Sequence, residues 1–338
     1  MEDVLSVGKL DMAFLSGLLE KYTATQDERV AIGAKIGEDA AVVDFGDRYL
    51  VAKTNPITFA TDEIGWYVVN VCVNNMVVRG VRPRWMMNTI LLPEDKTTPK
   101  LVEDIFRQIH EASQKVGVSI IGGHTEVTFG LDRPIVTGFV LGEIGRESLV
   151  ATSGAEVGDT VLITKALGVE GTAIIASELA DTLREKGYSD AFVSRAQGYL
   201  YDPGISVYKD ALTAADTGTV HAMTDATEGG LATALHEMAE AAGVGLLIEV
   251  ERIPVMPETK EICEAFGIDP IGLIASGMLI MTAPPDAVEG LCGALDKAGI
   301  PCTPIGEVRP ADEGRRLSKA GEVADLPYFA NDELTKVL

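Results

Sequence analysis

The second half of the chain alternates short apolar segments with segments of helical periodicity, and this alternation restricts the fold more than any other feature. Residues 160–163 form an apolar run typical of a strand, and residues 170–215 are mostly helical in pattern, with breaks near 187 and at 202–204. Alternating elements favour a layered α/β arrangement in which helices cover a sheet. The pattern continues with predicted strands at 219–223, 245–250, 277–282 and 303–308, and predicted helices at 229–242, 258–266 and 285–298.

The first half predicts an α+β arrangement of strands with two intervening helices. An amphipathic helix is expected over 11–22. Thr98 followed by Pro99 suits a helix start, so a helix is expected from there to about 116. The remaining predicted elements are a helix at 63–79 and strands at 40–44, 49–53, 84–92, 118–122 and 134–144.

The length of 338 residues fits about two domains. We expect an N-terminal domain over 1–150, a C-terminal domain over 155–310, and a polar, irregular tail over 311–338. Hydrophobic residues make up 46% of the chain and charged residues 23%, which is enough apolar material for a large packed core.

Charge and apolar patterning restrict the partners of the chain. It has 28 basic and 51 acidic residues, a net charge of −23, which repels phosphate backbones and disfavours nucleic acid. No stretch approaches the roughly 18 apolar residues of a membrane span, and the N-terminus has no basic region typical of a secretory signal. A cytoplasmic protein without a membrane partner is therefore expected. The four cysteines include no CxxC pair, so they are expected to be structural thiols.

Glu38 and Asp39 follow Gly37 directly before a predicted strand. Two carboxylates beside a glycine turn suit a hard cation such as Mg²⁺, which prefers oxygen ligands. The alternative interpretation is a polar turn without a ligand.

Residues 122–126 form a second motif at the end of a predicted strand. Gly122 and Gly123 would let the backbone approach a phosphate closely. His124, Thr125 and Glu126 would offer polar groups at the same edge. The alternative is a glycine turn between two strands.

A third motif has Gly168 and Gly171 between a strand and a helix. Free backbone N–H groups and the helix dipole at such a position suit an anion. No Lys followed by Ser or Thr is present there, so this is not a P-loop.

The fourth motif runs from a strand into Asp225, then Thr227, then the pair Gly229 and Gly230 before a helix. Asp225 is a candidate ligand for a metal ion or a hydroxyl group. Thr227 is a candidate helix cap, and capping alone is the alternative explanation of the motif.

In this order, the motifs resemble the superfamily of aminoimidazole ribonucleotide (AIR) synthase, also called PurM-like. Its members include selenophosphate synthetase, thiamine-monophosphate kinase and the hydrogenase expression/formation protein HypE. The likeness covers about residues 30–310, and the stretch from 225 to 255 looks most like HypE. The segments that carry it are 37–41 (GEDAA), 73–83 (VNNMVVRGVRP), 122–127 (GGHTEV), 167–178 (LGVEGTAIIASE) and 224–239 (TDATEGGLATALHEMA).

The resemblance implies a fold and a reaction. It implies a ferredoxin-like N-terminal domain that pairs into a β-barrel across a homodimer, through roughly residues 40–145, and a PurM C-terminal-like α/β domain. It also implies ATP in a cleft between the domains, with Mg²⁺ on acidic residues. Such an enzyme phosphorylates or activates a small substrate, chiefly by positioning and charge neutralisation.

The resemblance also implies roles for individual residues. Asn55 and Asn75 fall where kinase-like members have Asp, so two carboxylates have become amides and cation affinity is expected to fall. The implied metal ligands are Glu38, Asp39, Asn55, Asn75 and Asp225, and the implied catalytic residues are His124, Glu126 and Asp225. The implied nucleotide contacts are Gly122, Gly123, Thr125, Gly168, Gly171, Thr227, Gly229 and Gly230.

The sequence therefore predicts a HypE-like paralogue that binds ATP and Mg²⁺ and acts on a small substrate. HypE works on its own C-terminal cysteine, whereas the last cysteine here is Cys302, so that route is not expected. Two alternatives stay open: a small-molecule kinase similar to thiamine-monophosphate kinase, and a nucleotide-binding regulatory protein without catalysis. A protein partner of the hydrogenase-maturation type is a further expectation from the resemblance.

Overall fold

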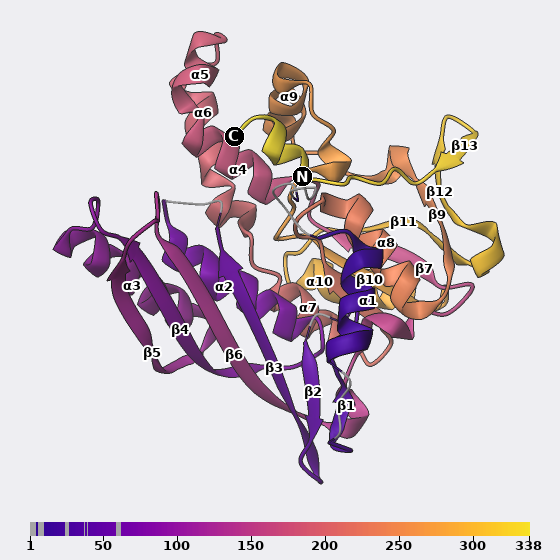
Figure 1. Cartoon of the computed structure of the whole chain (residues 1–338). Coiled ribbons are helices and arrows are strands. Elements are labelled where there is room, and N and C mark those ends of the chain that lie inside the picture. The colour runs from indigo at the N-terminus through magenta and orange to yellow at the C-terminus, as the bar shows by residue number, and fades with distance from the viewer. Residues whose placement is uncertain (1–4, 6–9, 24–26, 37, 39, 59–61) are drawn as a thin grey trace. The chain divides into compact units, whose positions relative to one another are not determined.

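The structure is a computed structural model that describes residues 5, 10–23, 27–36, 38, 40–58 and 62–338. The chain divides into two compact units. One contains Asp39–Leu149 with Thr25–Gly33, and the other contains Val150–Leu338 with Met1–Ala24 and Ala34–Glu38. Figure 1 follows the chain through both.

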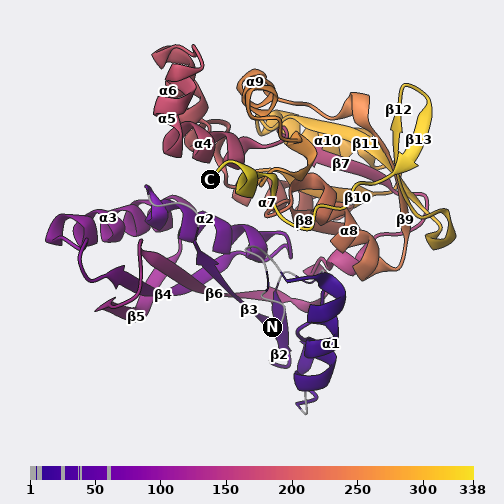
Figure 2. The same cartoon turned by 45° about the horizontal axis from the view of Figure 1, so that its top comes forward.

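The unit of Asp39–Leu149 is built on an open six-stranded sheet with the order β1-β2-β3-β6-β4-β5. Its strands β4 and β5 are parallel, and the other neighbours are antiparallel. Helices α2 and α3 cover one face of the sheet (Figure 2). The strands are β1 (Val30–Ile32), β2 (Ala41–Asp44), β3 (Arg48–Ile57), β4 (Pro83–Pro93), β5 (Ser119–Thr128) and β6 (Ile135–Gly145), and the helices are α2 (Ile64–Val77) and α3 (Pro99–Val116).

The connectivity of this unit differs from the ferredoxin-like order that the resemblance implies. A ferredoxin-like domain has the order βαββαβ. Here helices follow the consecutive strands β3 and β4, and β5 connects to β6 without a helix. The helix α3 is required because β4 and β5 are parallel neighbours, which a tight turn cannot join. The dimeric barrel stays a prediction, because a single chain is described.

The unit of Val150–Leu338 contains a mixed seven-stranded sheet with the order β13-β12-β9-β11-β7-β10-β8. Its strands are β7 (Thr160–Thr164), β8 (Ala222–Asp225), β9 (Gly245–Glu249), β10 (Leu279–Ala283), β11 (Cys302–Arg309), β12 (Arg315–Lys319) and β13 (Glu322–Asp325). Its helices are α1 (Met12–Tyr22), α4 (Val169–Glu178), α5 (Ala180–Glu185), α6 (Asp190–Gly198), α7 (Tyr208–Ala215), α8 (Gly230–Ala242), α9 (Pro257–Phe266) and α10 (Val288–Lys297).

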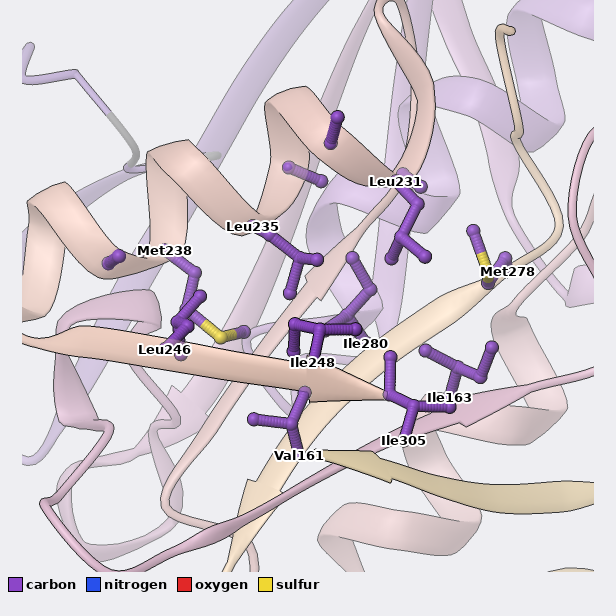
Figure 3. Packing of buried hydrophobic residues seen from close by; sticks show 14 of the residues in the cluster. Val161, Ile163, Leu231, Leu235, Met238, Leu246, Ile248, Met278, Ile280 and Ile305 are labelled. Atoms are coloured by element: carbon purple, nitrogen blue, oxygen red, sulfur yellow. The ribbon is translucent and has the colours of Figure 1, made fainter. Parts of the chain in front are cut away.

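The core of this unit lies between α8 and the sheet. Figure 3 shows Leu231, Leu235 and Met238 of α8 facing the apolar side chains of the strands. The spacing of these three residues by three or four positions gives the helix one apolar face. The strand side chains of the cluster include Val161, Ile163, Leu246, Ile248, Ile280 and Ile305.

The expected helices and strands up to residue 309 are present, with ends shifted by a few residues. The expectation of an irregular tail over 311–338 is wrong. Strand β12 adds to β9 in parallel, and β13 pairs with β12 at the edge of the sheet. Strand β13 is exposed and β12 is mostly half-buried, and both carry charged side chains, so their sequence lacks the apolar alternation of a strand.

The second motif is also placed differently from the expectation. Residues 122–126 lie within β5, which continues to Thr128, and are neither a strand end nor a turn. The register of β5 on β4 shifts between Ile120 and Gly122, which indicates a β-bulge at Ile121. The bulge lets the strand continue past the glycines.

Candidate functional site

Strand β5 presents His124 and Glu126 on an exposed edge. Among the described strands it pairs only with β4, and residues 119–127 are exposed within the chain. His124 Nε2 lies 3.0 Å from Glu126 Oε2, because residues two apart in a strand point to the same face. The two side chains are 63% and 49% exposed, so their pairing adds little stability. An imidazole beside a carboxylate can move a proton to or from a bound molecule.

The two glycines of this motif stand in different surroundings. A Cβ atom on Gly123 would lie 2.1 Å from the carbonyl oxygen of Asn88, its partner in β4. A Cβ atom on Gly122 would have Met87 as its nearest neighbour at 3.8 Å. The close approach of two strands therefore requires glycine at 123, whereas no such contact requires it at 122.

Asn55 and Asn75, which the family resemblance implies as metal ligands, are in contact. Asn55 lies on β3 and Asn75 on α2. The Asn55 side-chain amide donates a hydrogen bond to Asn75 Oδ1 over 3.1 Å, and Asn75 is only 4% exposed. The two amides are therefore held in place within one unit. An aspartate at 75 would accept the same hydrogen bond and add a negative charge.

The predicted acidic pair is only partly described. The backbone N–H of Glu38 donates to the carbonyl oxygen of Lys35 over 3.3 Å, while Asp39 lies outside the described residues. Among the residues that the structure describes, no group of three or more His, Cys, Asp or Glu side chains is arranged to hold a metal ion. A Mg²⁺ site would therefore need Asp39 or ligands from a nucleotide.

Gly168 and Gly171 pack against other parts of their own unit, and Gly171 lies within the first turn of α4 rather than before the helix. Gly168 is the N-cap of α4 with φ of 65°, and a Cβ there would lie 2.9 Å from Thr259 Cγ2. A Cβ on Gly171 would lie 2.4–2.8 Å from the side chain of Leu273. The Gly171 N–H donates to the carbonyl oxygen of Ile274 over 3.0 Å. Packing by the 271–274 loop thus explains Gly171 without a ligand.

The start of α8 is also packed against the loop at 271–274. Asp225 ends β8 and is 4% exposed, so the strand delivers a buried carboxylate to this point. The N-cap is Gly229, and the carbonyl oxygen of Thr227 accepts from Gly230 N–H over 2.9 Å, so Thr227 is not the helix cap. A Cβ on Gly230 would lie 2.5 Å from the carbonyl oxygen of Ile271.

The carboxylate at this helix start comes from Asp332, which sequence reasoning missed. Its Oδ2 accepts from Gly229 N–H over 2.6 Å. Its Oδ1 accepts from Ile274 N–H over 3.2 Å and from Leu334 N–H over 2.8 Å. Burial raises the pKa of Asp332 to about 6, although these hydrogen bonds oppose the shift. The pattern of Asp before Glu333 and Leu334 signals a helix cap, but nothing in the sequence links it to Gly229.

Glu170 is a second buried acid in the same region. It lies in the first turn of α4, is 4% exposed, and its Oε2 accepts from Ser276 N–H over 3.0 Å. Burial, and to a lesser degree the negative charges of Asp332 and Glu228, raises the pKa of Glu170 to about 7, although the hydrogen bond from Ser276 opposes the shift. In the sequence, an acidic residue in the first turn of a helix is expected to be exposed. No pattern therefore identified Glu170 as buried.

Comparison with known proteins decides the family. The N-terminal domain of AIR synthase related proteins matches residues 37–144, and the C-terminal domain matches residues 156–318. A carbamoyl dehydratase HypE of Rhodobacter capsulatus is 32% identical over 264 residues, 77% of this chain and 72% of that protein. The chain belongs to the AIR synthase-related family. A putative hydrogenase expression/formation protein of Methanocaldococcus jannaschii is 27% identical over 288 residues, 83% of this chain and 82% of that protein.

Solved structures of the AIR synthase-related family share the fold. A HypE–HypF complex has a TM-score of 0.74 at 23% identity, covering 93% of this chain and 100% of that one. HypE in complex with ATP has a TM-score of 0.71 at 22% identity, covering 92% and 90%. ThiL complexed with AMPPCP and TMP has a TM-score of 0.69 at 23% identity, covering 93% and 96%.

The family match covers all of the predicted site residues, while Asp332 lies beyond its last matched residue at 318. No helix in the described part of the chain is long and apolar enough to cross a membrane.

We expect Gly123→Ala to destabilise the Asp39–Leu149 unit by about 1–3 kcal/mol, because the new methyl group would overlap the Asn88 carbonyl oxygen. Gly122→Ala is the matched control and should change stability by less than about 0.5 kcal/mol. Urea unfolding of both variants measures the difference. Equal stabilities of the two variants would contradict the role given to the close strand contact.

We expect Glu170→Gln to change how stability depends on pH. The pKa of Glu170 is raised from 4.5 to about 7 in the folded state, so its contribution is full below about pH 4.5 and is lost as the pH rises through 7. Glutamine keeps an acceptor for Ser276 N–H and carries no charge. The free energy of unfolding of the variant should therefore exceed that of the wild type by about 1–3 kcal/mol at about pH 8, and by less at low pH.

Thermal or urea unfolding across that pH range measures the gain. Glu322→Gln on the exposed strand β13 is the control, and its stability should follow the wild type at every pH. A constant difference between Glu170→Gln and the wild type at all pH values would show that Glu170 does not titrate as described.

Proposed function

We propose that the chain binds ATP with Mg²⁺ and uses it to phosphorylate or activate a small substrate. Membership of the AIR synthase-related family supports this, since fold relatives have been solved as HypE in complex with ATP and ThiL complexed with AMPPCP and TMP. The observation that carries the proposal furthest is the contact between Asn55 and Asn75, both implied as ligands by the family resemblance. Asn55 Nδ2 lies 3.1 Å from Asn75 Oδ1.

The donor atoms of the proposed site suit Mg²⁺, a hard cation that prefers oxygen. Asp39, with Asn55 and Asn75, would hold the ion on the Asp39–Leu149 unit. Glu38 and Asp225 are further carboxylates that the family resemblance implies as ligands. Mg²⁺ bound there would neutralise charge on the ATP phosphates. In a chain of net charge −23, that neutralisation is needed before an anionic nucleotide can bind near carboxylates.

His124 and Glu126 are the proposed groups for orienting the substrate and moving a proton. Their side chains face the same way on β5 and are exposed within the single chain. Gly122, Thr125 and Gly168 are the proposed backbone contacts to the nucleotide. The N–H groups of Gly171 and Gly229 already donate within the chain, so they would bind phosphate only after the loop at 271–274 or Asp332 moves.

Two other functions have specific support. A kinase similar to thiamine-monophosphate kinase is supported by the fold shared with ThiL, but the amides at 55 and 75 weaken cation binding. A non-catalytic nucleotide-binding protein is favoured by the same amides. Steady-state ATP hydrolysis with candidate substrates separates them, because a binding protein holds ATP without turnover. A HypF-type protein partner follows only from the likeness to the HypE–HypF complex.

We also propose a homodimer in which a second copy covers β5. This edge strand is exposed on both faces and leaves one side of its backbone unpaired by any described strand. Its apolar residues Ile120, Ile121 and Val127 are 42%, 53% and 55% exposed. Edge strands of this kind pair readily with another chain, and a two-fold arrangement would also build the barrel that the family resemblance implies.

We expect light scattering to give about twice the chain mass of 35.9 kDa at micromolar concentration. The Val127→Lys variant should be more monomeric than the wild type, because the lysine charge would be buried in the interface. Val323→Lys is the control, since Val323 is an equally exposed valine (60%) on the edge strand of the other sheet. A wild-type mass of one chain would contradict the dimer.

We expect Asp39→Asn to weaken the Mg²⁺ dependence of ATP binding by at least about tenfold, because it removes a predicted carboxylate ligand and leaves the two neutral amides. Asn75→Asp should instead tighten Mg²⁺, since it keeps the hydrogen bond from Asn55 and adds a charge. Glu126→Gln is the control for a general loss of acidity. Titration of Mg²⁺ at fixed ATP, followed by calorimetry or thermal shift, measures all three.

Identical Mg²⁺ midpoints in the three variants would contradict the proposed metal ligands but would not contradict ATP binding. No heat and no thermal shift with millimolar ATP would instead contradict nucleotide binding itself.

A further inference from the structure

Cys292 and Cys302 form a close pair of thiols that the proposed reaction does not use. Cys292 lies in α10 and Cys302 begins β11. Their sulfur atoms are 3.1 Å apart, and both residues are partly exposed. The other two cysteines, Cys72 and Cys263, are buried.

The geometry of the pair is that of a dithiol close to bond formation. A disulfide has sulfur atoms about 2.05 Å apart, so the two sulfurs need to approach by only about 1 Å. Only the end of α10 and a short connection containing Gly299 separate the two residues. Burial and the neighbouring Cys292 thiol raise the pKa of Cys302, so that sulfur keeps its proton at neutral pH.

We propose that Cys292 and Cys302 are a redox-active pair that closes reversibly to an intramolecular disulfide by exchange with a low-molecular-weight disulfide such as oxidised glutathione. One thiol loses its proton and attacks the external disulfide, which releases one molecule of thiol and leaves a mixed disulfide on the protein. The second thiol then attacks that protein sulfur and releases the second molecule of thiol. The protein loses two electrons and two protons, and the external disulfide gains them.

The neighbours of the pair indicate what closure would constrain. Cys302 pairs in register with Thr164 at the end of β7, and Lys165 N–H donates to the carbonyl oxygen of Pro301 over 3.0 Å. Thr164 Oγ1 donates to Asp210 Oδ1 over 2.7 Å, and Lys165 Nζ lies 3.2 Å from the same atom. A disulfide between α10 and β11 would therefore hold in place the start of β11, which contacts the end of β7 beside the buried Asp210. The inference does not depend on nucleotide binding.

The test uses the reduced full-length chain, incubated with oxidised glutathione at about pH 8.5, where an ordinary thiol is half ionised. Intact-mass measurement should show the loss of two hydrogen atoms, and peptide mapping without reductant should link the peptides of Cys292 and Cys302. Dithiothreitol should restore the starting mass. Closure should also raise the melting temperature, because it restricts the unfolded chain.

Cys292→Ser and Cys302→Ser should each stop closure and instead retain one glutathione as a mixed disulfide. Cys72→Ser and Cys263→Ser are the matched controls and should close as the wild type does. A wild type that accumulates glutathione adducts without closing would overturn the proposal. The proposal would also be overturned if the folded wild type kept its mass while the urea-unfolded chain reacted under the same conditions.

Discussion

The carboxylate of Asp332 joins three segments that are far apart in the sequence. It accepts hydrogen bonds from Gly229 at the start of α8, from Ile274 in the 271–274 loop, and from Leu334 in its own turn. The N-terminus of α8 therefore has its negative partner from within the chain, as a helix dipole favours. The loop held in this way packs directly on Gly171 and Gly230, where a side chain would overlap it.

This arrangement changes the meaning of the glycine motifs in the C-terminal unit. In the sequence they are typical of loops that approach a phosphate, and in the structure they meet the loop at 271–274 and the carboxylate of Asp332. The cost of the arrangement is the burial of acidic groups close together, which raises the pKa of both Asp332 and Glu170. Asp332 and Glu170 are consequently expected to change their charge at neutral or slightly acidic pH.

The sequence predicted those parts of the fold that depend on local patterns. The helix after Thr98 begins as expected, because Thr98 accepts from Leu101 N–H and Pro99 follows it. The apolar face of α8 gave its core contacts with Ile248 and Ile280. Strands β12 and β13 could not be predicted, because their exposed charged residues resemble a loop. Asp332 could not be predicted either, because its partners at 229 and 274 come from long-range packing. At the candidate site, Asn55 and Asn75 are in contact and Asp39 lies outside the described residues, so the role of all three as metal ligands stays a prediction.

The central claim is that ATP binds with Mg²⁺ at Asp39 and the two asparagines, while Asp332 keeps the start of α8 closed. A crystal structure of the full chain grown with AMPPCP and Mg²⁺ tests this most directly. The account predicts a Mg²⁺ ion between the phosphates and Asp39, with the Asp332 carboxylate still accepting from Gly229 N–H. Phosphates bound at the N-terminus of α8 in place of that carboxylate, with no ion near Asp39, would contradict it.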